Sequence, residues 1–114
     1  MNENKAQIVE IGETNFKSEV MEWKRPVLVA FLAHWSRPCY VVRPVLDEVS
    51  AACGGSIKVV KINADDNPGL GMAYEIHSIP TLVCFVDGKE RARIVGTASK
   101  EAILGKLKPS KGTI

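Results

Sequence analysis

Two uninterrupted hydrophobic runs dominate the pattern of apolar and polar positions along the chain. One covers residues 27–32, Val-Leu-Val-Ala-Phe-Leu, and the other covers residues 81–86, Thr-Leu-Val-Cys-Phe-Val. Both runs are short and β-branched or aromatic, and proline or turn residues bound them, which is typical of strands covered on both faces. A weaker, more alternating run at residues 57–62 predicts a third strand, and residues 8–11 predict an edge strand.

A hairpin signal follows the second run. The dipeptide Asp87-Gly88 is a strong turn signal, and residues 91–95 behind it alternate between polar and apolar positions. We therefore expect residues 91–95 to form a strand that pairs with residues 81–86.

Between the strands, apolar residues recur at helical spacing. The expected helices cover residues 15–23, 39–53, 68–74 and 100–107. Thr14, Asn67 and Ser99 are the expected N-caps of the first, third and fourth of these helices, and Gly54-Gly55 is expected to end the second. In the first helix, the pattern places Phe16, Val20 and Trp23 on one apolar face.

The resulting order of elements, β-α-β-α-β-α-β-β-α, predicts an α/β fold. Alternating βαβ units imply parallel strands with helices on both faces of the sheet, and the hairpin adds one antiparallel strand. A length of 114 residues supports one domain, residues 1–114, with its core at about residues 8–107 and short polar tails.

Composition narrows the classes of partner. The net charge is only +2 and the basic residues are scattered, which argues against nucleic acid as the main partner. The longest apolar stretch, residues 26–33, is far shorter than a bilayer-spanning helix, and the polar N-terminus has no signal-peptide hydrophobic region. These features predict a cytoplasmic protein with no membrane association.

The chain has three cysteines, Cys39, Cys53 and Cys84, and an odd number at wide spacing is not a disulfide framework. Cys84 is expected to pack in the core and Cys53 to be partly exposed at a helix end. With His34 and His77, Cys39 offers too few ligands for a metal site. We therefore predict no metal and no cofactor.

One stretch carries candidate chemistry. Residues 33–39, Ala-His-Trp-Ser-Arg-Pro-Cys, run directly into a predicted helix, and Ile79-Pro80-Thr81 opens the second hydrophobic run. This combination resembles the thioredoxin family, whose signature is Trp-Cys-Gly-Pro-Cys facing a cis-proline in an Ile-Pro-Thr step. Further matches keep the same register at residues 44–48, 61–65 and 67–69, at Gly88 and at residues 95–96.

The resemblance covers residues 8–107 and implies a thioredoxin fold, with a central mixed sheet of about five strands flanked by about four helices. It also implies a cis bond at Pro80, and a peptide-binding groove formed by residues beside the motif and the proline. The implied groove residues are Trp35, Arg37, Pro38, Ile79 and Pro80.

The chain departs from the family pattern at the groups that drive the chemistry. The position of the family's nucleophilic cysteine is Ser36, the glycine between the cysteines is Arg37, and the family's buried aspartate falls at Ala30. A serine hydroxyl stays protonated at neutral pH and does not displace sulfur, whereas thiol–disulfide exchange needs a thiolate. Ser36 stands where a helix N-cap belongs, and Cys39 is then the only thiol of the motif.

Two functions remain open at this point. The first is a redox-degenerate thioredoxin-like protein that binds a protein or peptide with an extended segment or a cysteine, with at most monothiol chemistry at Cys39. The second is a protein-disulfide oxidoreductase in which the cysteine at position 36 has been replaced by serine. Dithiol reductase turnover is not expected of the sequence as written, and a monomer is expected in both cases.

Overall fold

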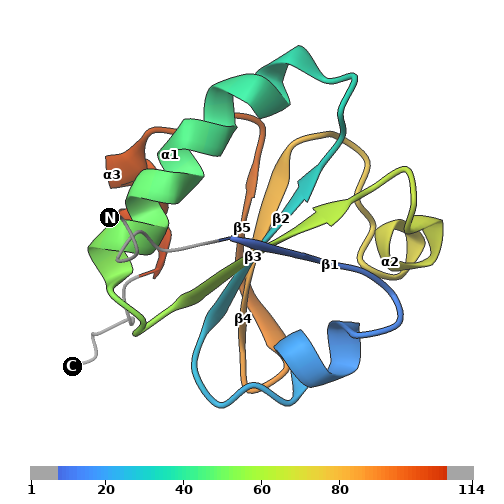
Figure 1. Cartoon of the computed structure of the whole chain (residues 1–114), viewed down its shortest axis with the longest axis horizontal. Coiled ribbons are helices and arrows are strands. Elements are labelled where there is room, and N and C mark those ends of the chain that lie inside the picture. The colour runs from blue at the N-terminus through green and yellow to red at the C-terminus, as the bar shows by residue number, and fades with distance from the viewer. Residues whose placement is uncertain (1–7, 108–114) are drawn as a thin grey trace.

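The computed structural model describes residues 8–107, so the predicted polar tails at residues 1–7 and 108–114 lie outside the described part (Figure 1). The strands are β1 (Val9–Ile11), β2 (Val27–Leu32), β3 (Lys58–Asn63), β4 (Thr81–Val86) and β5 (Lys89–Val95). The helices are the π-helix η1 (Lys17–Met21) and the α-helices α1 (Arg37–Cys53), α2 (Pro68–Ala73) and α3 (Lys100–Leu107). The predicted order of strands and helices is confirmed.

The five strands form one mixed sheet in the order β1-β3-β2-β4-β5. Strands β1, β3 and β2 are parallel, β4 is antiparallel to β2, and β5 is antiparallel to β4. The antiparallel strand is therefore β4, and the expectation that the hairpin would reverse only β5 is wrong. The chain enters β4 at the end of the sheet where β2 and β3 finish, since Thr81 lies opposite Phe31, which lies opposite Ile62.

This reversal brings the ends of three strands together at one end of the sheet. In the register of the sheet, Leu32 at the end of β2 lies opposite Asn63 at the end of β3, and Phe31 lies opposite Thr81 at the start of β4. Helix α1 also begins at this end of the sheet, since it follows β2 after a short loop. The candidate site lies here, where the three strand ends meet.

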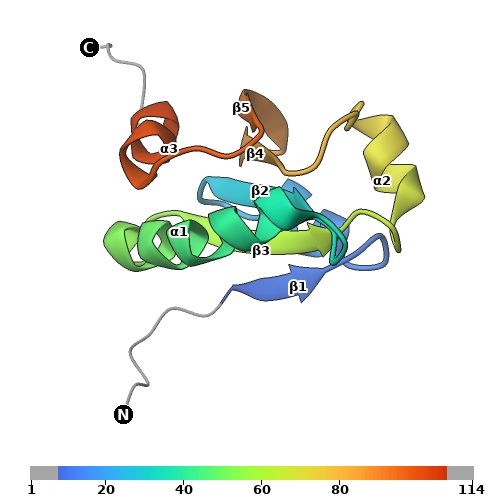
Figure 2. The same ribbon diagram turned by 90° about the horizontal axis from the view of Figure 1, so that it is seen from above.

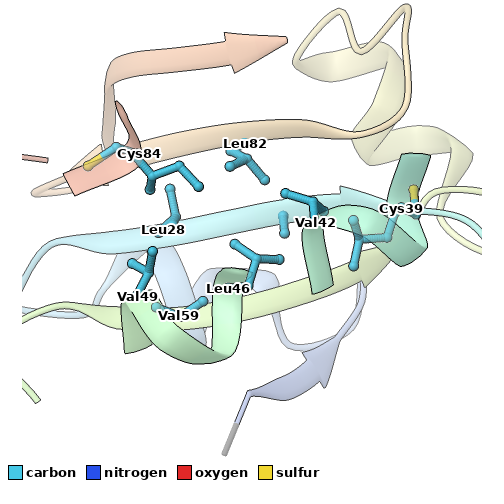
Figure 3. Close-up of a cluster of buried hydrophobic side chains, with 11 residues drawn as sticks. Leu28, Cys39, Val42, Leu46, Val49, Val59, Leu82 and Cys84 are labelled. Atoms are coloured by element: carbon cyan, nitrogen blue, oxygen red, sulfur yellow. The ribbon is translucent and has the colours of Figure 1, made fainter. Parts of the chain in front are cut away.

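Helices cover both faces of the sheet, as predicted. Figures 1 and 2 show α1 and α3 together on one face, with α2 and η1 on the opposite side of the sheet. Buried side chains of α1, α3, β2 and β4 form one hydrophobic cluster, part of which is drawn in Figure 3. A second cluster lies under η1 and α2 and contains Phe16, Val20 and Phe31.

The first predicted helix is shorter than expected. Only Lys17–Met21 is helical, the residue at its N-cap position is Phe16 rather than Thr14, and its side chain makes no capping bond. Phe16 and Val20 are buried as predicted, but Trp23 is 40% exposed. Because the helix ends before Trp23, this ring leaves the apolar face and lies under the Lys58 ammonium, 3.4 Å from the ring centroid.

The other predicted helix ends agree with the structure in part. The Ser99 hydroxyl accepts the Ala102 N–H at 3.1 Å and caps α3, as predicted. Gly54 adopts a left-handed conformation with φ 57° and ends α1. Asn67 precedes α2 without capping it, because its side-chain oxygen accepts the N–H of Glu13 instead. Among residues 8–107, none of the helices has the length and apolar character needed to cross a bilayer.

Candidate functional site

The segment between β2 and α1 carries the predicted motif. Trp35 is 70% exposed, and its indole Nε1–H donates to a carboxylate oxygen of Asp65 at 2.8 Å, which holds the ring over the loop after β3. Arg37 and Pro38 are also exposed. These three predicted groove residues therefore line an accessible surface at the start of α1.

Cys39 is fully buried in the first turns of α1, with an exposed fraction of 0%. Its Sγ accepts the Ala33 N–H at 3.4 Å, and the side chain belongs to the cluster that includes Ala30, Leu32 and Val42. Figure 3 shows Cys39 at one end of this cluster, where α1 starts. The thiol is thus packed like a small hydrophobic side chain.

Ser36 occupies the N-cap position of α1 with φ −88° and ψ 117°, and it is only 3% exposed. Its side chain makes no capping hydrogen bond. Ser36 therefore stands at the N-cap position as predicted, but the capping bond expected of its side chain does not form, and the Ser36 carbonyl accepts the Cys39 N–H at 3.1 Å instead. Helix α1 begins at Arg37 rather than Cys39, since Pro38 suits the first turn of a helix.

The segment before β4, which contains Ile79 and Pro80, lies at the same end of the sheet. The Ile79–Pro80 bond is cis, Pro80 is buried, and its carbonyl accepts the Gly96 N–H at 2.8 Å. Ile79 is half-buried and packs against the cluster that contains Cys39. Because β4 starts opposite the end of β2, the structure brings together two segments that are about 40 residues apart in the sequence.

No carboxylate occupies the position expected for the family's buried aspartate. Ala30 is 0% exposed and lies opposite Lys61 of β3 and Leu82 of β4. Lys61 in turn lies opposite Glu10 of the edge strand. The interior beside Cys39 therefore contains a methyl group where a proton-accepting carboxylate would be needed.

Two residues that the sequence analysis did not single out adjoin the motif. The Tyr40 hydroxyl donates to the His34 carbonyl at 2.8 Å, and the Arg43 guanidinium lies 5.0 Å from the Tyr40 ring centroid. The Arg43 Nε is buried with no hydrogen-bond partner. The sequence spacing could have predicted that Tyr40 and Arg43 lie together, because residues three apart on a helix are neighbours.

The remaining cysteines lie away from the motif. Cys84 is buried and Cys53 is partly exposed, as predicted, and burial raises the pKa of both thiols. In the described residues, 8–107, no three histidine, cysteine, aspartate or glutamate side chains gather as a metal site would require. The thiol chemistry of the site therefore depends on Cys39.

Comparisons with known proteins agree on one family. The family model described as Thioredoxin matches residues 7–109. "Thioredoxin 1" of Synechococcus elongatus is 42% identical over 97 residues, which are 85% of this chain and 91% of that protein. "Thioredoxin 1" of Nostoc sp. is 43% identical over 94 residues, 82% of this chain and 88% of that protein. "Thioredoxin" of Rickettsia felis is 39% identical over 94 residues, 82% and 90% of the two chains.

Proposed function

Because this chain belongs to the thioredoxin family, we propose that it is a redox-degenerate member that binds an extended protein or peptide segment beside Pro80. Cys39 supplies at most single-thiol chemistry in this function. The observation that carries the proposal is the pairing of a serine at position 36 with a fully buried Cys39. The fold and the exposed residues Trp35, Arg37 and Pro38 are present, whereas the position of the family's nucleophilic cysteine holds a serine.

No second thiol is placed to resolve a mixed disulfide on Cys39. Cys53 lies at the other end of α1, fourteen residues away, or about 21 Å along the helix. Cys84 lies opposite Leu28, and the strand from there to Ala33, whose N–H bonds Cys39, is about 16 Å long. Disulfide formation needs Cα atoms within about 7 Å, so a dithiol cycle has no partner among these cysteines.

The backbone of Ile79 supports segment binding. Within residues 8–107, neither its N–H nor its carbonyl takes part in a backbone hydrogen bond, whereas the neighbouring Pro80 carbonyl is paired with Gly96. Unpaired backbone groups at a strand end can pair with an added extended chain. The exposed Trp35 ring, in the loop before α1, provides apolar contact area beside the motif.

The binding half of the proposal is tested by NMR. A pool of blocked random heptapeptides should shift the Ile79 amide signal and the Trp35 indole N–H signal of the ¹⁵N-labelled protein. The amides of Gly54 and Lys89, which lie at the far ends of α1 and of β4, should not move. A spectrum in which Ile79 and Trp35 stay unchanged at saturating peptide contradicts the groove.

The redox half is tested by insulin reduction with dithiothreitol. The protein should leave the rate of insulin precipitation at its uncatalysed value, because a serine hydroxyl does not attack a disulfide. The Ser36→Cys variant should accelerate it, and the matched control Ser36→Cys/Cys39→Ser should not turn over. Turnover by the unmodified chain equal to that of Ser36→Cys would contradict the redox-degenerate assignment and favour the oxidoreductase.

A further inference from the structure

A small cavity lies between the sheet and α1, next to the loop that precedes the helix. It has a volume of about 40 Å³, and its polar lining consists of Glu10 of β1, Lys61 and Asn63 of β3, Arg43 of α1 and His34 of the loop. One water molecule needs about 10–15 Å³, whereas drug-sized ligands occupy sites of about 300 Å³ or more. The cavity therefore suits a compact ion rather than a larger molecule.

The strand register explains why these side chains meet. Residues two apart on a strand point to the same face of a sheet, and Val59, two residues before Lys61, packs in the cluster under α1. Lys61 therefore points to the face that α1 covers. Glu10 lies directly opposite Lys61 in the neighbouring strand and shares this face. Arg43 of α1 closes the cavity from the helix side.

Arg43 brings a hydrogen-bond donor without a partner to this cavity. Its Nε is buried, and no hydrogen bond of this atom is found within residues 8–107. Buried polar groups normally have a partner. The contact with the Tyr40 ring, 5.0 Å from the guanidinium to the ring centroid, is not a hydrogen bond and does not supply one. The Nε–H therefore points to an acceptor that a ligand in the cavity provides.

The charges of the cavity favour an anion that also carries a proton. Lys61 and Arg43 are half-buried cations and Glu10 is an exposed carboxylate, and in the described part of the chain none of the three takes part in an ion pair. Two positive charges and one negative charge leave an excess of one positive charge, which an anion balances. An ionised carboxylate only accepts hydrogen bonds. Glu10 therefore repels an anion without a proton and accepts a hydrogen bond from an anion that has an O–H group.

We propose that this cavity binds inorganic phosphate. The Arg43 Nε–H and the Lys61 ammonium donate to phosphate oxygens, and the Glu10 carboxylate accepts a hydrogen bond from the protonated oxygen that phosphate keeps at neutral pH. Arginine N–H groups form a fork that matches phosphate oxygens, and hydrogen bonds between charged groups are stronger than neutral ones. Sulfate has the same shape but no proton, so it cannot donate to Glu10. The site goes beyond the proposed function, because it needs neither the Cys39 thiol nor a bound segment.

Titration of the ¹⁵N-labelled protein with sodium phosphate tests the site by NMR. The Arg43 Nε–H signal and the amide signals of Ala33 and Ile62, which line the cavity, should shift and saturate. The amides of Gly54 and Lys89, at the far ends of α1 and β4, should not move. In a parallel titration at the same ionic strength, sulfate should bind about tenfold more weakly, the ratio that one hydrogen bond to a charged group supports.

Three variants locate the effect. Glu10→Gln should abolish the preference for phosphate over sulfate, because an uncharged amide can donate to either anion. Arg43→Gln should weaken phosphate binding about tenfold, through the loss of one hydrogen bond to a charged group. Lys89→Gln removes one positive charge at the far end of the sheet and should leave both affinities unchanged.

Four results would overturn the inference. An Arg43 Nε–H signal that stays in place at saturating phosphate would mean that the cavity holds water only. Equal affinities of the unmodified protein for phosphate and sulfate would remove the role of Glu10. Phosphate binding that is unchanged in Arg43→Gln, or lost in Lys89→Gln, would place the ion elsewhere. Lys61→Gln gives the same test at the second donor if Arg43→Gln fails to fold, and the proposed function is unaffected by any of these results.

Discussion

Helices α1 and α3 both begin after a serine, and the two serines behave differently. Ser99 is exposed, its hydroxyl accepts the Ala102 N–H at 3.1 Å, and Glu101 adds a negative charge in the first turn of α3. Ser36 is buried and makes no capping bond, and Arg37 opens the first turn of α1. The start of α3 is thus completed by local side chains, whereas the start of α1 is not.

The difference teaches that a helix can be held by packing along its length instead of by a side-chain cap. An incomplete end has to be held by something other than its cap, and α1 buries Cys39, Val42, Leu46 and Val49 along its 17 residues. The eight residues of α3 bury only Ile103 completely. Packing along a long helix therefore stabilises α1 without a side-chain cap.

The largest expected effect tests whether packing holds α1. Leu46→Ala, at a position only 1% exposed, should lower the free energy of unfolding by about 2–5 kcal/mol through lost burial and a cavity. Val41→Ala on the same helix, 59% exposed, is the control and should change it by less than about 0.5 kcal/mol. Equal effects of the two variants in urea unfolding would break the comparison, because α1 would then not depend on its buried face.

A smaller effect compares the two serines directly. Ser99→Ala should lower the free energy of unfolding by about 1 kcal/mol, the usual contribution of a serine cap. Ser36→Ala should change it by only a few tenths of a kcal/mol, since no capping hydrogen bond is lost. Both variants can be measured in the same denaturant series. A loss at Ser36 as large as that at Ser99 would show that the α1 cap does form in solution.

The smallest effect sharpens the comparison by completing the end of α1. Ser36→Asp should raise the free energy of unfolding by about 0.3–1 kcal/mol at pH 7, because a carboxylate interacts favourably with the helix N-terminus. Ser99→Asp, the matched control, only exchanges one good cap for another and should give no comparable gain.

The gain from Ser36→Asp should also depend on pH in a definite direction. The helix end lowers the pKa of the introduced carboxyl in the folded state, so the stabilisation is present above its unfolded pKa, near about 3.9, and is lost as the pH falls through the folded pKa. Thermal unfolding at a series of pH values measures it. A gain that persists at pH 2 would show that charge is not its cause.

Much of the fold was predictable from local patterns. Strands β2 and β4 coincide with the two hydrophobic runs, and the Ser99 cap and the Gly54 helix end are where the sequence predicts them. These features depend on neighbours a few residues apart, so spacing and residue type are enough to locate them. The exposure of Trp23 and the reversal of β4 were not predictable, because both depend on how distant segments pack.

For the candidate site, the sequence by itself determined the chemistry that is missing: a serine at position 36, an alanine at position 30 and a single thiol at Cys39. Residue identity limits which bonds can form, whatever the fold. Only the tertiary structure decided that Cys39 is fully buried, that the Ser36 hydroxyl leaves its helix uncapped, and that Ile79 packs on the cluster beside them. Burial and hydrogen-bond partners depend on side chains and strands far away in the sequence, and the pairing of β2 with β4 is what brings them together.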